Sequence, residues 1–151
     1  MATAPIPPTQ SEIAERILQE HGALRQKVHR IHSVLAEPNP NRAEIESLLR
    51  EFLNALVIHF ANEEEDGFFT EVISRAPQHT GRAGALCVEH QQLLRETEEL
   101  CRFAEAGSPS MPWWRELNAR CHEFSKRLMH HESEENRLLQ EVHSLDIGLG
   151  D

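Results

Sequence analysis

The chain has 151 residues, of which 39% are hydrophobic and 26% charged, so it is long enough for one domain with one buried core and too apolar for a disordered chain. Its net charge of -10 argues against a protein that binds nucleic acid or an anionic membrane surface. No apolar run approaches the roughly 20 residues that a membrane-spanning helix needs, and the N-terminus has no basic region or apolar stretch typical of a signal peptide.

Proline and glycine divide the chain into long segments rich in Glu, Leu, Arg, Gln and Ala, which are good helix formers. Residues 1–9 form an N-terminal tail, and the first helix starts after Thr9, which with Glu12 has the spacing of a capping box. Asn41 and Glu44 repeat that spacing at the start of the second helix. The expected helices cover residues 10–36, 42–66 with an extension towards 75, 81–106 and 112–143.

Residues 144–151 are expected to form a C-terminal tail, which leaves 10–143 as the folded domain. No segment alternates polar and apolar residues in the manner of a strand. The fold class is therefore all-α. Because the connections between the long helices are short, we predict an up-down-up-down antiparallel four-helix bundle.

Each predicted helix has a core-facing stripe of apolar residues at spacings of three and four, and each stripe contains a histidine. His21 and His90 stand alone in the first and third helices. In the second and fourth helices, a glutamate follows the histidine four residues later: His59 with Glu63, and His131 with Glu135. A buried histidine or carboxylate is unfavourable unless it is hydrogen-bonded or binds a metal, so this recurrence indicates a metal site.

The distances from these histidines to the helix ends place them at similar heights. His21 lies 17 residues before Pro38 and His59 lies 18 residues after Asn41, which corresponds to about 26 Å in each helix. The two halves of the chain also form a weak internal repeat, because Glu20-His21 is matched by Glu89-His90. A pseudo-two-fold arrangement would bring two equivalent sets of ligands to one centre.

The sequence offers two adjacent His–Glu pairs for the core-facing stripe of the last helix, and it contains histidines outside the predicted stripes. His130 and Glu134 also have the spacing of His131 and Glu135, but only His131 continues the apolar stripe of its helix. The remaining histidines are expected to be solvated or to cap helices: His29, His32, His79, His122 and His143. One of the acidic residues at 64–66 could orient a ligand histidine, and Phe60 is expected to pack in the core.

The predicted metal ligands are His21, His59, Glu63, His90, His131 and Glu135. Mixed imidazole and carboxylate ligands inside a helix bundle suit iron or manganese. Zinc ranks lower, because six protein ligands exceed what one four-coordinate zinc ion needs. The three cysteines form no CxxC pair, which favours a reducing compartment such as the cytoplasm.

These residues make the chain resemble the haemerythrin-like (HHE cation-binding) family. The matching segments are EHGALRQKV, HFANEEEDGFF, EHQQLLRE and HESEENRLLQ, and the order His, HxxxE, His, HxxxE covers nearly the whole chain, residues 13–143. The resemblance implies a non-haem di-iron centre with His21 and His90 as terminal ligands, His59 and His131 as further ligands, and Glu63 and Glu135 as bridging carboxylates.

The resemblance also implies a small ligand such as oxygen or nitric oxide, bound for sensing, delivery or detoxification. Two alternatives are an enzyme that turns over peroxide, nitric oxide or oxygen, and an iron-handling or structural metal module. Oxygen carriers of the family have an HxxxH motif on the third helix and an aspartate five residues after the last histidine. At these two positions this chain has Leu94 and Asn136. These departures predict either an open or water-filled position on one iron, or another residue that fills this position.

Overall fold

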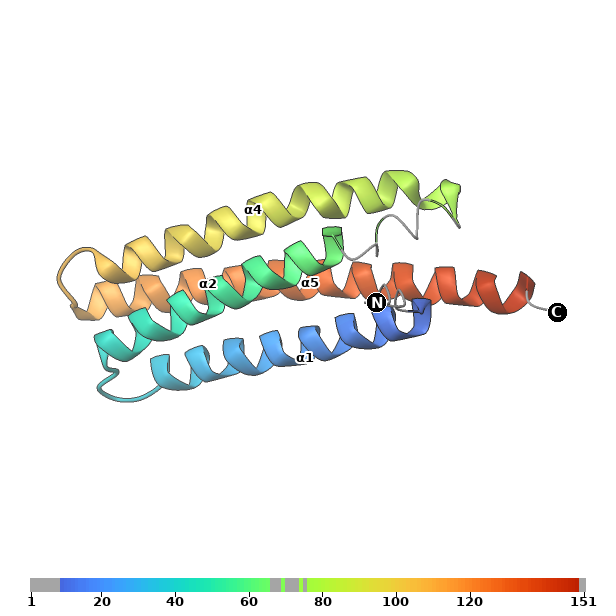
Figure 1. The fold of residues 1–151 in the computed structure, drawn as a ribbon. Helices are drawn as coiled ribbons and strands as arrows, with labels where there is room; N and C mark the ends of the chain where they lie inside the picture. Colours follow the sequence, from blue (N-terminus) through green and yellow to red (C-terminus); the bar gives the residue numbers. More distant parts are fainter. Residues whose placement is uncertain (1–8, 66–68, 70–73, 75, 150–151) are drawn as a thin grey trace, which may run out of the picture.

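In a computed structural model the chain folds into four long antiparallel helices (Figure 1). The structure describes residues 9–65, 69, 74 and 76–149, with the side chains of 10, 11 and 143–149 left out. The elements are α1 (Gln10–Leu35), α2 (Arg42–Glu65), the short 3-10 helix η1 (Pro77–His79), α4 (Thr80–Glu105) and α5 (Met111–Leu149). No strand occurs in these ranges, so the all-α prediction is confirmed.

The helices form a closed ring of neighbours: α1 packs against α2 and α5, and α4 packs against α2 and α5. The α1–α2 and α4–α5 connections lie at one end of the bundle, and the start of α1 and the end of α5 lie at the other (Figure 1). This arrangement is the predicted up-down-up-down bundle. Within the described part of the chain, no helix is long and apolar enough to cross a membrane.

The helix starts follow the capping residues of the sequence. Thr9 Oγ1 accepts a hydrogen bond from the Glu12 backbone N–H and the Thr9 N–H donates to the Glu12 carboxylate, which completes the predicted capping box. Asn41 Oδ1 accepts a hydrogen bond from the Glu44 N–H. Most of the predicted extension of α2 towards residue 75 lies outside the described residues, which include only 69 and 74 of this segment.

The last helix is longer than predicted. It continues to Leu149, whereas the sequence placed its end near residue 143. The expectation rested on the glycines at 148 and 150, but a glycine weakens a helix by only about 1 kcal/mol and does not end it by itself. In Figure 1, α5 accordingly projects beyond the other helices.

Two apolar clusters fill the bundle, one on each side of a polar layer that contains the six predicted ligands. The large apolar cluster lies towards the α1–α2 connection, and its buried residues are Leu24, Ile31, Val34, Ile45, Leu49, Phe52, Leu56, Phe60, Leu93, Leu100, Cys101, Ala104, Leu117, Cys121, Phe124 and Leu128. The small apolar cluster comprises Ile13, Ile17, Phe69, Ala76, Ala83, Leu86, Leu138 and Val142. Burial of these side chains by the hydrophobic effect holds the polar layer between them.

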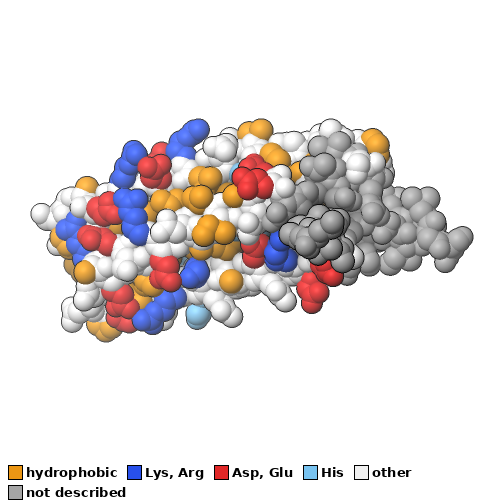
Figure 2. Space-filling model, viewed as in Figure 1, with side chains coloured by type: hydrophobic (Ala, Val, Ile, Leu, Met, Phe, Trp, Pro, Cys, Tyr) orange, Lys and Arg blue, Asp and Glu red, His pale blue; other side chains and the backbone are white. Residues whose placement is uncertain are grey.

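The face of the bundle seen in Figure 2 carries interspersed charges of both signs. Several acidic and basic side chains pair between neighbouring helices, as in the contact of Arg50 on α2 with Glu105 on α4. Exposed ion pairs of this kind contribute little to stability. Apolar packing is therefore what positions the polar layer.

Candidate metal centre

The six predicted ligands converge in the polar layer from all four long helices. Each of the six residues is at most 2% exposed to solvent. His131 and Glu135 face the interior, whereas His130 is exposed and Glu134 contacts Arg137 at the surface. The stripe of α5 therefore has the register that the sequence favoured.

The histidines form two pairs with nearly the same geometry. The rings of His21 and His59 lie 4.9 Å apart at 70°, and those of His90 and His131 lie 4.9 Å apart at 67°. One pair joins α1 and α2, and the other joins α4 and α5. This repetition is the geometric counterpart of the internal repeat in the sequence.

The two buried carboxylates lie between the histidine pairs. Glu63 Oε1 is 2.7 Å from His59 Nε2 and 3.8 Å from His90 Nε2. Glu135 Oε1 is 2.9 Å from His131 Nε2 and 3.5 Å from His21 Nε2. Each carboxylate thus reaches both halves of the bundle, which is the arrangement that a bridge between two metal ions needs.

Two groups of side chains could each hold a cation. The first group is His21, His59, Glu63 and Glu135, and the second is His90, His131 and Glu135. Within each group, ligand atoms from all members lie within 4.8 Å of one another. Because Glu135 belongs to both groups, the layer offers two adjacent positions that share a carboxylate.

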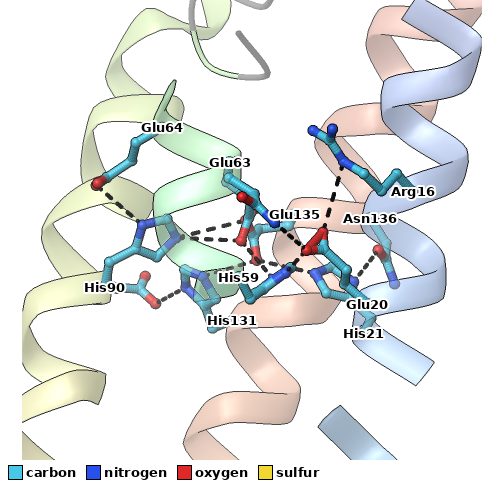
Figure 3. Close-up of polar contacts among 12 residues, drawn as sticks. Arg16, Glu20, His21, His59, Glu63, Glu64, His90, His131, Glu135 and Asn136 are labelled. Carbon is cyan, nitrogen blue, oxygen red and sulfur yellow. Dashed lines mark hydrogen bonds and ion pairs between the residues drawn. The ribbon is translucent and has the colours of Figure 1, made fainter. Parts of the chain in front are cut away.

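The ring nitrogens that face away from the layer have their own partners (Figure 3). His21 Nδ1 lies 3.0 Å from Asn136 Oδ1, His90 Nδ1 lies 3.3 Å from Glu64 Oε1, and His131 Nδ1 lies 3.0 Å from Glu89 Oε2. Carboxylate oxygens and the amide oxygen of Asn136 can only accept hydrogen bonds, so Nδ1 carries the proton in these rings and Nε2 presents a lone pair to the layer.

His59 has a looser outer contact. Its Nδ1 is 3.6 Å from Glu20 Oε2, beyond hydrogen-bond distance, while Glu20 Oε1 accepts a hydrogen bond from Asn62. The four outer partners thus form a ring in which each histidine contacts a residue of the neighbouring helix. Three of these partners are carboxylates, and the fourth is the amide of Asn136.

Eight nitrogen and oxygen atoms at the middle of the layer could bind a metal. The Nε2 atoms of all four histidines and both oxygens of Glu63 and Glu135 are buried and have no hydrogen-bond partner among the described residues. Such atoms are costly in an apolar interior unless something binds them. A metal accepts electron pairs from imidazole nitrogen and carboxylate oxygen, so the donor set fits metal ions.

Burial also shifts the protonation of these histidines. It lowers the pKa of His90 to about 3, with further lowering by His131 and His59. Burial likewise lowers the pKa of His21 and of His131. It acts in the same direction on His59, but the carboxylates of Glu63, Glu20 and Glu132 raise the pKa of that ring above its ordinary value. Neutral imidazole is the form that binds metal.

The sequence alone does not predict three of the residues that orient the ligand histidines. Glu20, Glu89 and Asn136 contact these rings, and the repeated Glu-His dipeptide was the available signal for the first two. Asn136 contacts the outer nitrogen of His21 through its amide oxygen. Glu64, by contrast, is one of the acidic residues suggested for this orienting role.

Phe60 and Glu132 are also part of the surroundings of the layer. Phe60 is buried in the core, as predicted, and in addition stacks on the His90 ring at 3.9 Å. Glu132 is 4% exposed, and burial raises its pKa. No pattern in the sequence singled out Glu132, because it lies one residue outside the apolar stripe.

Comparison with known protein families gives one match. The family described as the Hemerythrin HHE cation binding domain matches residues 12–142, which cover the four helices and the whole polar layer. Neither the curated proteins nor the solved structures contain a match.

Proposed function

The chain belongs to the hemerythrin HHE cation-binding family, and we propose that it holds a non-haem di-iron centre. That centre binds a small diatomic ligand, such as oxygen or nitric oxide, for sensing, delivery or detoxification. One observation carries the proposal: eight unpartnered donor atoms from four histidines and two glutamates meet in one buried layer. We assign His21, His59, Glu63, His90, His131 and Glu135 as the metal ligands.

The choice of two irons follows from the donor set and its charge. Six nitrogen- and oxygen-donating side chains exceed what one tetrahedral zinc ion needs, and no cysteine belongs to either cation-binding group found among the described residues. The carboxylates of Glu63 and Glu135 are joined by those of Glu20, Glu64 and Glu89 behind the histidines. This concentration of negative charge suits more than one divalent cation.

The protein's own contribution is to orient ligands and exclude water. The outer partners hold each imidazole so that Nε2 faces inward, and the apolar clusters close the layer on both sides. When bound, iron supplies the redox chemistry and a coordination position for the small ligand. Because the six side chains are at most 2% exposed, only a small molecule can reach them without moving a helix.

Stoichiometric titration of the reduced protein with oxygen or nitric oxide tests this function. We expect about two irons per chain and an optical change that saturates at a fixed ratio of ligand to iron. His59→Ala should lose both, and His130→Ala, at an exposed neighbour of the layer, should keep both. A protein that folds fully and binds no transition metal would overturn the proposal.

The same titration separates the two other functional classes. Continued consumption of oxygen, nitric oxide or peroxide beyond the stoichiometric amount would assign an enzyme. Bound metal with no response to these molecules would assign iron handling or a structural role. We further propose a cytoplasmic location, supported by the free thiols of Cys87, Cys101 and Cys121.

A further inference from the structure

The outer contact of His59 is built from two helices. On α2, Asn62 Nδ2 donates a hydrogen bond of 2.8 Å to Glu20 Oε1 of α1. The other carboxylate oxygen, Glu20 Oε2, lies 3.6 Å from His59 Nδ1 and 4.0 Å from Arg16 Nε (Figure 3). His59 and Asn62 are three residues apart, so they share one face of α2. One carboxylate is therefore shared between a histidine of the polar layer and an amide of the same helix.

Two atoms that face each other at this contact have no hydrogen bond. Glu20 Oε2 and His59 Nδ1 are both buried, and neither has a hydrogen-bond partner among the described residues. Nε2 of a neutral His59 can bind a metal only when the ring proton lies on Nδ1, and that N–H then needs an acceptor. Glu20 Oε2 is the acceptor that faces it, and a shift of about 0.5 Å would bring the two atoms to hydrogen-bond distance.

Asn62 limits how the Glu20 carboxylate can turn. Because the amide holds Oε1, Oε2 stays directed at His59. Without the amide, a carboxylate whose side chain is 23% exposed could rotate towards solvent or towards Arg16. An amide suits this place because it donates a hydrogen bond without a charge of its own, so the negative charge behind His59 is retained.

The second half of the bundle has a carboxylate in place of this amide. The residue three positions after His131 is Glu134, which offers no donor to Glu89 and contacts Arg137 at 3.5 Å. Glu89 is held instead by its own contact with His131, at 3.0 Å, and its side chain is 38% exposed. The hydrogen bond of Asn62 thus distinguishes one cation-binding group from the other.

We propose that Asn62 is a positioning residue of the metal centre. Its amide holds Glu20 so that Oε2 accepts a hydrogen bond from Nδ1 of His59, and this contact keeps Nε2 of His59 directed into the polar layer. The inference rests on the proposed function, because it requires His59 to be a metal ligand. It concerns only the cation-binding group that contains His59.

Anaerobic calorimetric titration of the metal-free protein with ferrous iron tests this role. Asn62→Leu removes the donor at similar volume, and Asn62→Gln keeps an amide. We expect two binding events in each protein, with one of them weakened about tenfold in Asn62→Leu and restored towards the unaltered value in Asn62→Gln. Asn54→Leu is the matched control, because Asn54 is an exposed asparagine of the same helix, and its isotherm should equal that of the unaltered chain.

Two further measurements separate positioning from a contact that only stabilises the fold. In a Glu20→Ala background, Asn62→Leu should not weaken iron binding further, because Asn62 acts through Glu20. In the protein loaded with ferrous iron, proton NMR should show one exchangeable imidazole N–H signal that shifts in Asn62→Leu and returns in Asn62→Gln. The N–H signals of the other ligand histidines should stay unchanged.

Two results would overturn the role of Asn62 alone. One is an iron isotherm and a set of N–H signals that are identical in Asn62→Leu and the unaltered chain. The other is a loss of affinity on Asn62→Leu that is equally large with and without Glu20. An unaltered chain that binds fewer than two irons would overturn the proposed function as well.

Discussion

Replacement of Glu135 by glutamine should stabilise the metal-free protein and destabilise the metal-bound protein. Glu135 is fully buried, and neither of its oxygens has a hydrogen-bond partner within the described structure. Without metal, any charge on this carboxylate is desolvated, and His131, whose Nε2 lies 2.9 Å from Oε1, does not offset that charge because burial lowers the pKa of its ring. In the proposed metal centre, the same carboxylate would be shared by the two cation-binding groups.

The size of both effects follows from the burial of Glu135. A buried polar group without a partner costs about 1–3 kcal/mol, and a charged one costs more. Glu135→Gln should therefore raise the free energy of unfolding of the metal-free protein by about 1–3 kcal/mol, or the Tm by about 3–9 °C. In the metal-bound protein, a hundredfold weaker affinity would remove about 2.7 kcal/mol of stability.

Thermal unfolding followed by circular dichroism measures both effects at about pH 8. One sample contains a chelator and the other contains ferrous iron under anaerobic conditions. Glu134→Gln should leave the Tm of both samples unchanged, because Glu134 lies partly at the surface. A Glu135→Gln protein that is destabilised equally in both samples would show that the carboxylate is a structural group and not a metal ligand.

Three further outcomes are expected. The free energy of unfolding of the metal-free protein should decrease as the pH falls below about 6.5, because His90 has a pKa of about 3 when folded and takes up a proton on unfolding. This group alone contributes up to about 5 kcal/mol to the decrease. A urea-unfolding free energy that stays constant between about pH 4 and 6.5 would contradict the prediction. Glu89→Ala should weaken iron binding about 10- to 100-fold by freeing the His131 ring, and an unchanged calorimetric isotherm would count against an orienting role. Phe60→Ala should cost about 3–5 kcal/mol in urea unfolding, since its ring is 1% exposed, and a loss below about 1 kcal/mol would show that the layer does not depend on this packing.

The bundle and the inward-facing side chains could be predicted because they depend on local periodicity. The α2 stripe from Ile45 to Glu63 is buried at every predicted position, and so is the α5 stripe from Leu117 to Val142. On α1, the predicted stripe consists of Ile17, His21, Leu24, Val28, Ile31 and Leu35. Val28 and Leu35 are only partly buried, while Ile13 and Val34, which are outside this stripe, are in the core. Periodicity fixes the face of a helix, and the packing of its neighbours decides the width of that face.

The outer partners could not be predicted because they connect different helices. Glu20 precedes His21 in the chain but contacts His59, and Glu89 precedes His90 but contacts His131. These pairings depend on how far each helix is rotated about its axis, which spacing along one helix does not determine. The burial of Glu132 and the stacking of Phe60 on His90 have the same origin.

Outside the layer, the same limitation applies to His32. The sequence placed it among solvated or capping histidines, but its Nε2 lies 2.7 Å from Ser125 Oγ and its ring stacks on His122 at 4.2 Å. Both contacts join α1 to α5, so they arise from the packing of two helices that are distant in the sequence.

An anomalous-scattering map of protein crystals, recorded at the iron absorption edge, tests the central claim most directly. The account predicts two iron peaks about 3.5–4 Å apart in the polar layer, one beside His21 and His59 and the other beside His90 and His131. A single peak, or iron bound outside the layer in a protein with the same fold, would contradict the two-metal centre.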